Sequence, residues 1–300
     1  MRHLLHFFTV FFVALFFGNV FWSCNKFEGD QTIPAYIHID TIVLSTDYFT
    51  HGAATSNITD AWIYIDNNIV GAYELPATFP VLEKGKHKIT VRPGIKLNGI
   101  SSTRVWYPFY SNFEIADFEL IEDSVRTIHP TTTYTSTTFI TWMEDFEGAD
   151  ISLTRGSSSD TMISKTPAND PNAWQSPYSA HSGVVHLDEE HQSFDLYSFD
   201  KFADLPGLGA YVMLEIDYKC TQPFMVGMLA VATGSSATDY PLINVAPTDK
   251  WKKIYINLSP TVSENINNVD YFQVYFSGAL GNDPTATFYF DNIKLIYNKD

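Results

Sequence analysis

The chain has 300 residues, with 18 lysines and arginines against 34 aspartates and glutamates, so its formal net charge is −16. Nucleic acids are bound by basic side chains that displace counterions from phosphates, and this acidic composition therefore excludes them as expected partners. The length is sufficient for two domains of ordinary size.

The first residues have the pattern of an export signal. A basic residue precedes an apolar run rich in phenylalanine, Ser23 is a small residue before the expected cleavage point, and Cys24 follows directly. This pattern predicts a signal peptide over 1–23 and a lipidated, palmitate-bearing Cys24, which would anchor the protein in the outer membrane, facing the cell surface. Two alternatives stay open. One is an uncleaved signal anchor, because the apolar run 4–22 is close to the roughly 20 residues that span a bilayer, and the other is ordinary secretion.

A short polar segment, 24–32, is typical of a flexible tether. From 33 to 140 the chain consists of short runs of alternating apolar and polar residues, separated by turn signals such as Asn98-Gly99. Alternation with a period of two, interrupted by regular turns, indicates β-strands. The sequence therefore predicts an all-β first domain over 33–140.

One strand of this first domain has a recognisable pattern. The segment reads G-x-H-x-I-x-V, with Gly85, His87, Ile89 and Val91, and follows a turn after an earlier strand-like run. It resembles the Ig-like sandwich of PEGA-type surface modules. The resemblance implies an Ig-like β-sandwich.

A cluster of aromatic residues interrupts the strand pattern at 106–110, which reads WYPFY. Because proline cannot donate a ladder hydrogen bond, Pro108 favours a loop or a sheet edge over a central strand. Large apolar groups in such a place often mark interaction sites. We therefore expect an exposed patch for a protein partner, formed by Trp106, Tyr107, Phe109 and Tyr110.

A segment rich in threonine and serine, 129–141, separates the two parts of the chain and fits either a flexible linker or an extended edge strand. The second domain, 141–300, begins with WMEDFEG at 142–148 and ends with FYFDNIKLIY at 288–297. This pair resembles the first and last strands of the jelly roll of carbohydrate-binding modules, also called galactose-binding-like. The resemblance implies a second β-sandwich in which these two strands lie side by side.

The same resemblance implies a structural calcium ion near the first and last strands. Asp145, Glu147 and Asp291 match the family positions, and carboxylate oxygens are the ligands that calcium prefers. The alternative is that Asp145 and Glu147 are solvated strand residues and that Asp291 caps a turn.

Glycan recognition requires aromatic faces next to polar side chains that fix hydroxyl groups. Aromatic residues make up 15% of the chain. The polar loop around residue 174 predicts a ligand site with Trp174 and Tyr178 as stacking platforms, Asn172 and Gln175 as polar partners, and Tyr240 as a further aromatic. The alternative is that Trp174 fills one end of the sandwich.

Catalytic motifs are missing from the sequence. It has no G-x-S-x-G, no H-E-x-x-H, no phosphate-binding glycine loop and no paired cysteines. The run HLDEEH at 186–191 is read as a solvated turn, and Cys220, in a strand-like run, as a small apolar core residue. A glycosidase stays open, because its two carboxylates are recognised by their separation in space and not by sequence spacing.

The whole chain resembles outer-membrane lipoproteins of the Bacteroidota. We expect a non-enzymatic envelope lipoprotein that binds a glycan or surface polymer. The alternative is a structural subunit of an outer-membrane complex for protein assembly, export or motility, which would dock through the WYPFY patch and the acidic faces.

Overall fold

The structure is a computed structural model that describes residues 33–234 and 236–299. The expected signal peptide, Cys24 and the tether lie outside these residues. Within the described part of the chain, none of the helices has both the length and the hydrophobicity needed to cross a bilayer.

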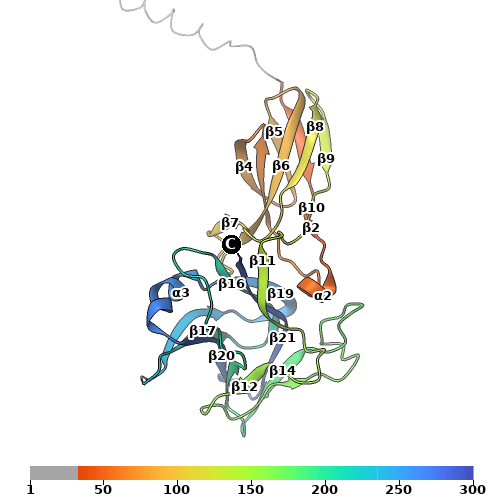
Figure 1. Cartoon of the computed structure of the whole chain (residues 1–300). Helices are drawn as coiled ribbons and strands as arrows, with labels where there is room; N and C mark the ends of the chain where they lie inside the picture. The colour runs from red at the N-terminus through yellow and green to blue at the C-terminus, as the bar shows by residue number, and fades with distance from the viewer. Residues whose placement is uncertain (1–32, 235, 300) are drawn as a thin grey trace, which may run out of the picture.

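The N-terminal part is a β-sandwich, drawn in orange to yellow in Figure 1. One sheet has the order β5-β1-β9, and the other has the order β4-β3-β6-β7 with β8 also paired to β6. A short parallel pair, β2 with β10, and the one-turn helix α2 lie at its lower end. The elements are β1 (Ala35–Ile39), β2 (Val43–Leu44), α2 (Tyr48–His51), β3 (Asp60–Ile65), β4 (Asn68–Glu74), β5 (Ala77–Val81), β6 (Gly85–Lys96), β7 (Arg104–Trp106), β8 (Phe113–Leu120), β9 (Val125–Ile128) and β10 (Thr131–Thr132).

Alternating burial explains why these strands form two facing sheets. In β1 the residues Ala35, Ile37 and Ile39 are buried and the residues between them are half-buried. Ile63 of β3 and Val91 of β6 are buried from the opposite sheet and belong to the same apolar cluster. The predicted all-β first domain is confirmed, and the G-x-H-x-I-x-V run forms the first half of β6.

The C-terminal part is a second β-sandwich, drawn in green to blue in Figure 1. The junction sheet, which faces the N-terminal sandwich, has the order β13-β14-β21-β16-β19, with β11 also paired to β21; the far sheet has the order β12-β15-β20-β17-β18. The elements are β11 (Thr138–Glu144), β12 (Leu153–Arg155), β13 (Ser164–Lys165), β14 (Gly183–Leu187), β15 (Ser193–Ser198), β16 (Val212–Cys220), β17 (Phe224–Val231), β18 (Thr238–Val245), β19 (Thr248–Asn257), α3 (Ser259–Asn265), the 3₁₀ turn η1 (Ile266–Asn268), β20 (Tyr271–Ala279) and β21 (Ala286–Asn298).

The predicted pairing of the first and last strands is confirmed. β11 runs antiparallel to β21, with Trp142 opposite Leu295 and Glu144 opposite Ile293. The threonine-rich segment before it contributes β10 and the start of β11, so most of it is extended chain.

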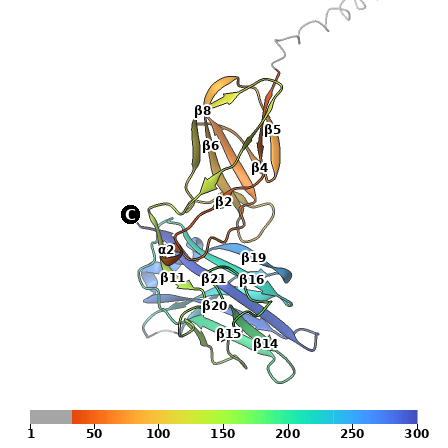
Figure 2. The ribbon, with the colours of Figure 1, turned by 90° about the vertical axis from the view of Figure 1, so that its right-hand side faces the viewer.

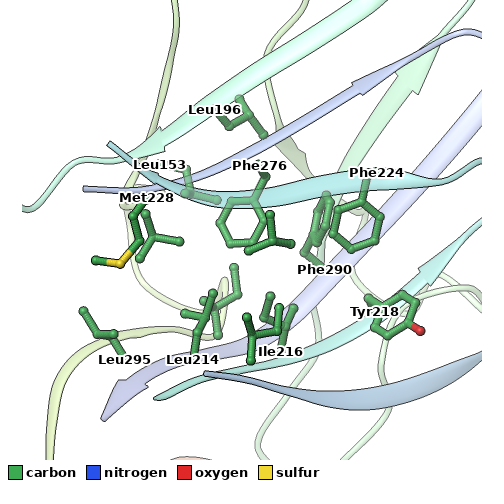
Figure 3. Close-up of a cluster of buried hydrophobic side chains, with 14 of the residues drawn as sticks. Leu153, Leu196, Leu214, Ile216, Tyr218, Phe224, Met228, Phe276, Phe290 and Leu295 are labelled. Atoms are coloured by element: carbon green, nitrogen blue, oxygen red, sulfur yellow. The ribbon is translucent and has the colours of Figure 1, made fainter. Parts of the chain in front are cut away.

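The core of this sandwich lies between its two sheets. In Figure 3, Phe276, Leu196 and Met228 of the far sheet face Leu214 and Leu295 of the junction sheet, and all five are buried. Truncating a buried phenylalanine such as Phe276 to alanine costs about 3 to 5 kcal/mol in comparable cores. This layer holds the far sheet in place and leaves its outer face free.

The junction sheet is buried on both faces. Figure 2 shows β16, β19 and β21 next to the N-terminal sandwich, with β15 and β20 on the far side. Along β21, every residue from Asp291 to Tyr297 is buried, because the inner side chains enter the sandwich core and the outer ones meet the N-terminal sandwich.

The expectation of an exposed WYPFY patch is wrong for three of its four aromatic residues. Tyr107, Phe109 and Tyr110 are at most 3% exposed, and only Trp106, at 39%, reaches the surface. The three buried rings pack against Met213, Tyr255 and Ile296 of the junction sheet. The cluster is therefore an internal docking surface between the two sandwiches of the same chain.

Polar groups are buried beside these rings. The Lys253 ammonium lies 3.2 Å from Oε2 of Glu215 and 3.7 Å from Oδ2 of Asp217. The Tyr107 hydroxyl donates a 2.8 Å hydrogen bond to Oε1 of Glu215, and the Tyr134 hydroxyl donates one of the same length to Oε2. Buried charges are tolerated only when they are paired in this way, so the network requires both sandwiches to be present.

Candidate functional site

A groove of about 680 Å³ lies on the outer face of the far sheet. We call it the sheet groove. Its residues come mainly from β15, β20, β17 and β18, the strands of the far sheet. In Figure 2, β15 and β20 of this sheet are on the side of the molecule away from the N-terminal sandwich. Concave sites with a few convergent polar groups are the usual places of ligand binding.

The strand register arranges the groove residues in two parallel rows. In the first row Tyr197 pairs with Tyr275, Tyr275 with Gly227, and Gly227 with Pro241. Neighbouring strands lie about 4.8 Å apart, so a row over four strands is roughly 14 Å long. An extended ligand that crosses the strands would follow this row.

The second row is mainly polar. Asp195 pairs with Ser277, Ser277 with Met225, and Met225 with Asn244. On β15, β17 and β20 the two rows are two residues apart and therefore share one face. On β18 a register shift places Asn244 three residues after Pro241, and both line the groove. The groove thus places an aromatic strip beside a strip of carboxylate, hydroxyl and amide groups.

Two glycines shape the floor. A Cβ atom at Gly227 would lie 2.3 Å from Cζ of Tyr275, and one at Gly156 would lie 2.6 Å from Oδ2 of Asp195. Neither contact is sterically allowed, so the missing side chains let the tyrosine ring and the carboxylate lie close to the backbone. The hollow depends on glycine at both positions.

Acidic groups dominate the electrostatics of the groove. Burial raises the pKa of Asp195, and the charge of Asp239 adds to this shift, although the hydrogen bond from Tyr197 opposes it. Burial and both carboxylates raise the pKa of Tyr275 to about 12. No lysine or arginine is among the described residues that line the groove. The site therefore suits hydroxyl donors and disfavours anionic ligands.

Trp174 and Tyr178 lie together in a different place, a pocket of about 420 Å³ beside α2. The ring of Tyr178 stacks on Tyr48 with 4.7 Å between centroids, and Trp174 meets Trp251 edge to face at 5.9 Å. Tyr178 is 61% exposed, whereas Trp174 is partly buried. The structure brings the two predicted platforms together, but both rings already have aromatic neighbours.

The other three predicted ligand residues do not join them in one site. Asn172 accepts hydrogen bonds from Lys219 at its side chain and from Trp251 at its carbonyl, and the Gln175 amide donates to nearby loop carbonyls. Tyr240 is on β18, where its hydroxyl donates to Asn265 and its ring packs on the core. Tyr240 does not line the sheet groove, although its neighbours Asp239 and Pro241 do.

The three predicted calcium ligands have hydrogen-bond donors from the protein. Asp145 accepts from the Tyr48 hydroxyl, Glu147 from the backbone N–H groups of residues 180 and 181, and Asp291 from the Ser182 hydroxyl. Across residues 33–234 and 236–299 no group of three or more His, Cys, Asp or Glu side chains is arranged to hold a metal ion. As arranged here, the three carboxylates do not fit a calcium site, and calcium binding stays a prediction.

Two further expectations are confirmed. The acidic residues at 188–190 are exposed in the connection between β14 and β15, where Asp188 accepts hydrogen bonds from the backbone of residues 190 and 191. Cys220 is buried in the sandwich core, and burial raises the pKa of its thiol to about 11. Neither feature provides a reactive group.

Sequence reasoning missed the sheet groove. Asp195 and Tyr197 stand two residues apart in the run SFDLYS, and polar residues at alternate positions of a strand-like run are ordinary in a sequence. The signal that could have indicated the site is the spacing of Asp195 and Tyr197, because a carboxylate and an aromatic ring at positions i and i+2 of a strand lie on the same face. The partner rows on β17, β18 and β20 come only from the register.

No protein-family model matches the chain, and no curated protein sequence matches it. Solved structures similar to it include the CBM22-1 and GH10 modules of Clostridium thermocellum endo-1,4-beta-D-xylanase 10B, with a TM-score of 0.34 and 14% identity over 54% of this chain and 29% of that one. A xylan-binding domain of family CBM22 has a TM-score of 0.35 and 13% identity over 53% and 94%. The family 11 module of Clostridium thermocellum Lic26A-Cel5E has a TM-score of 0.33 and 16% identity over 53% and 93%.

The chain spans less than a third of the first of these structures. At such TM-scores and identities the likeness carries no information on ligands or residue roles. What the structure itself shows is an all-β chain of two sandwiches, the second of which has one sheet face open to solvent.

Proposed function

We propose that the protein binds a neutral, hydroxyl-rich glycan in the sheet groove. The observation that supports this most is the pair of rows, in which Tyr197 and Tyr275 lie beside Asp195, Ser277 and Asn244 on one open face. Tyrosine rings contact the apolar faces of sugars, and carboxylate and amide groups bond their hydroxyls.

The sheet groove is a better candidate than the pocket with Trp174 and Tyr178. In that pocket the Tyr178 ring is stacked on Tyr48 and Trp174 packs against Trp251, so much of the aromatic surface is already in contact. The sheet groove is larger and crosses several strands, as an oligosaccharide needs.

The proposal is tested with a panel of neutral oligosaccharides and titration calorimetry of any that bind. We expect Tyr197→Ala and Asp195→Asn each to weaken binding by roughly tenfold or more, the effect of losing a ring contact or a charge-assisted hydrogen bond. Trp174→Ala is the matched control and should bind as the wild type does. Loss of binding in Trp174→Ala alone would move the site to the other pocket, and no binding across the panel would contradict the proposal.

The two carboxylates also keep a second candidate open, glycoside hydrolysis. Burial raises the pKa of Asp195, and the charge of Asp239 acts on it. Glycosidases use a pair of carboxyl groups, of which the general acid has a raised pKa. Release of reducing sugar from a bound glycan, abolished in Asp195→Asn, would favour this candidate. A bound glycan that stays intact would favour binding alone.

We propose further that the protein is a lipoprotein of the outer membrane, held by an acylated Cys24. The sequence supports this, because a basic residue, an apolar run and the small residue Ser23 directly before Cys24 form the pattern of an export signal cleaved at a cysteine. Stable membrane anchoring of such a body requires more than one acyl chain at that end. Labelling with palmitate in cells should mark the wild type and not Cys24→Ala, which should leave the membrane fraction. Labelling of both proteins would contradict it.

The alternative role as a subunit of an outer-membrane complex rested on the WYPFY patch and the acidic faces, and the first of these is not an exposed surface. Tyr107, Phe109 and Tyr110 are used inside the molecule. Purification of the native protein from detergent-solubilised membranes with a stoichiometric partner would restore that alternative.

A further inference from the structure

A second pocket, of about 330 Å³, lies where the two sandwiches meet. We call it the junction pocket. The N-terminal sandwich contributes Trp62, Tyr64 and Trp106, and the C-terminal sandwich contributes Tyr211 and Asn257. Trp106 is 39% exposed and Tyr211 is 50% exposed. The cavity thus has aromatic walls from both domains, and two of its rings remain open to solvent.

The register of the N-terminal sheet places a cation beside these rings. Trp62 of β3 is opposite Arg92 of β6, and Gly94, two residues further along, is opposite Trp106 of β7. The Arg92 guanidinium carbon lies 4.5 Å from the ring centroid of Tyr64 and 5.4 Å from that of Trp106. The cation is therefore held against two rings of the junction pocket.

Arg92 differs from the other basic residues of this face. Arg104 is paired with Asp60 and Glu74, at 3.0 and 2.5 Å, and Lys96 is paired with Glu74 at 2.8 Å. In the described parts of the chain, no carboxylate lies within ion-pair distance of Arg92, and its buried Nε–H has no acceptor. Its charge acts only at longer range, as a minor cause, after the Lys88 hydrogen bond, of the lowered pKa of Glu114.

The indole Nε1–H of Trp62 is a second buried donor that finds no acceptor among the described residues. Its edge lies over Gly94, where a Cβ atom would come within 3.0 Å of Nε1. Buried donors without partners are uncommon because each costs desolvation energy that no bond returns. Both donors belong to paired residues next to the cavity, since Trp62 lines it and the Arg92 guanidinium lies on two rings that line it.

We propose that the junction pocket binds a sugar ring that carries a carboxylate, such as a uronic acid. The rings of Trp62, Tyr64 and Trp106 suit the apolar face of a pyranose, and a guanidinium is the side chain that best matches a carboxylate. The pocket is thus complementary in charge to an acidic sugar, whereas the sheet groove, with Asp195 and Asp239, is not.

The test uses the full-length protein and four named probes, D-glucuronate, D-galacturonate, D-glucose and D-galactose. Binding is followed by calorimetry and by tryptophan fluorescence at concentrations up to roughly 10 mM, where even a millimolar Kd is measurable. We expect saturable binding of at least one uronate and roughly tenfold weaker binding of the matching neutral sugar, since a charged hydrogen bond is lost. Added salt should weaken uronate binding.

Matched variants locate the effect. Arg92→Gln and Trp106→Ala should each weaken uronate binding roughly tenfold or more, while Arg126→Gln should leave it unchanged, because Arg126 stacks on Phe118 away from the pocket. Thermal unfolding confirms that each variant is folded. Tyr197→Ala in the sheet groove should also leave uronate binding unchanged, so the two proposals fail separately. No saturable uronate binding, equal binding of neutral sugars, or full binding by Arg92→Gln would overturn the inference.

Discussion

The hydroxyl of Tyr107 donates a 2.8 Å hydrogen bond to Oε1 of Glu215, which is 108 residues later in the chain and in the other sandwich. Tyr107→Phe removes this donor and keeps the ring packing, so we expect a loss of about 1.5 to 3 kcal/mol in the free energy of unfolding, as for other bonds to charged groups. Urea unfolding measures it. Tyr211→Phe, at a half-exposed site, is the control and should change stability by less than about 0.5 kcal/mol.

The ammonium of Lys253 compensates two buried carboxylates, those of Glu215 and Asp217. Lys253→Met leaves both without their cation, and breaking a buried ion pair from one side costs about 3 to 5 kcal/mol. The neighbouring Lys252 is exposed, and Lys252→Met should be nearly neutral. Equal stability of the two variants in denaturant titrations would show that Lys253 is not needed to balance the charge.

The pKa of Asp291 gives the protein a characteristic pH dependence. Burial raises this pKa from 3.8 to about 8, with Asp217 and Asp145 adding to the effect and the Ser182 bond opposing it. The folded state therefore binds a proton that the unfolded state has released, and stability falls as the pH rises from about 4 to about 8, by up to about 1.4 kcal/mol per pH unit.

Asp291→Asn should flatten this slope, so the variant gains stability relative to the wild type as the pH rises through this window. Unfolding free energies at several pH values measure the difference. Lys294, whose pKa burial lowers to about 8, acts in the opposite direction and mainly above that pH. A parallel pH profile for both proteins would show that Asp291 is ionised in the folded state.

Gly227 lies under the Tyr275 ring in the sheet groove. Gly227→Ala should displace that ring, lower the thermal midpoint and weaken glycan binding, because overpacking costs about 1 to 3 kcal/mol. Gly148→Ala is the control, since the nearest atom to its new Cβ is 3.6 Å away. Unchanged binding in Gly227→Ala would mean that the Tyr275 platform does not contribute.

Calcium can be tested without mutation. Because protein donors already bond Asp145, Glu147 and Asp291, we expect the thermal midpoint to be the same with added calcium and with a chelator. A rise with calcium that disappears in Asp145→Asn would instead support the calcium site that the sequence predicts.

The sequence predicts the two sandwiches and one long-range strand pair. Alternation in runs such as 35–39 indicates strands because burial on one face leaves a period of two, and the motif at 288–297 places β21 beside β11. The contacts between the two sandwiches cannot be predicted from strand periodicity or from sequence motifs. WYPFY reads as an exposed loop because no local pattern shows that Tyr107 meets Glu215.

The candidate sites were predicted less well for the same reason. Trp174 and Tyr178 were found because aromatic residues in a polar loop are conspicuous, and the structure does place them in one pocket. Asp195 and Asn244 were not found, because a polar residue on an outward strand position is ordinary until the register sets it beside three others. Residues between 193 and 279 contribute to one groove only through pairings across four strands.

The position of β21 determines the order in which the chain can fold. This strand is the last described element of the chain, yet it lies inside its sheet, bonded to β16 on one side and to β11 and β14 on the other. A chain that emerges from its N-terminus can complete the first sandwich early, but Tyr107, Phe109 and Tyr110 then stay uncovered until residues 286–298 arrive. A truncation that removes this strand would leave the C-terminal sandwich without a central strand. It would also leave the aromatic face of the N-terminal sandwich partly uncovered and prone to aggregation.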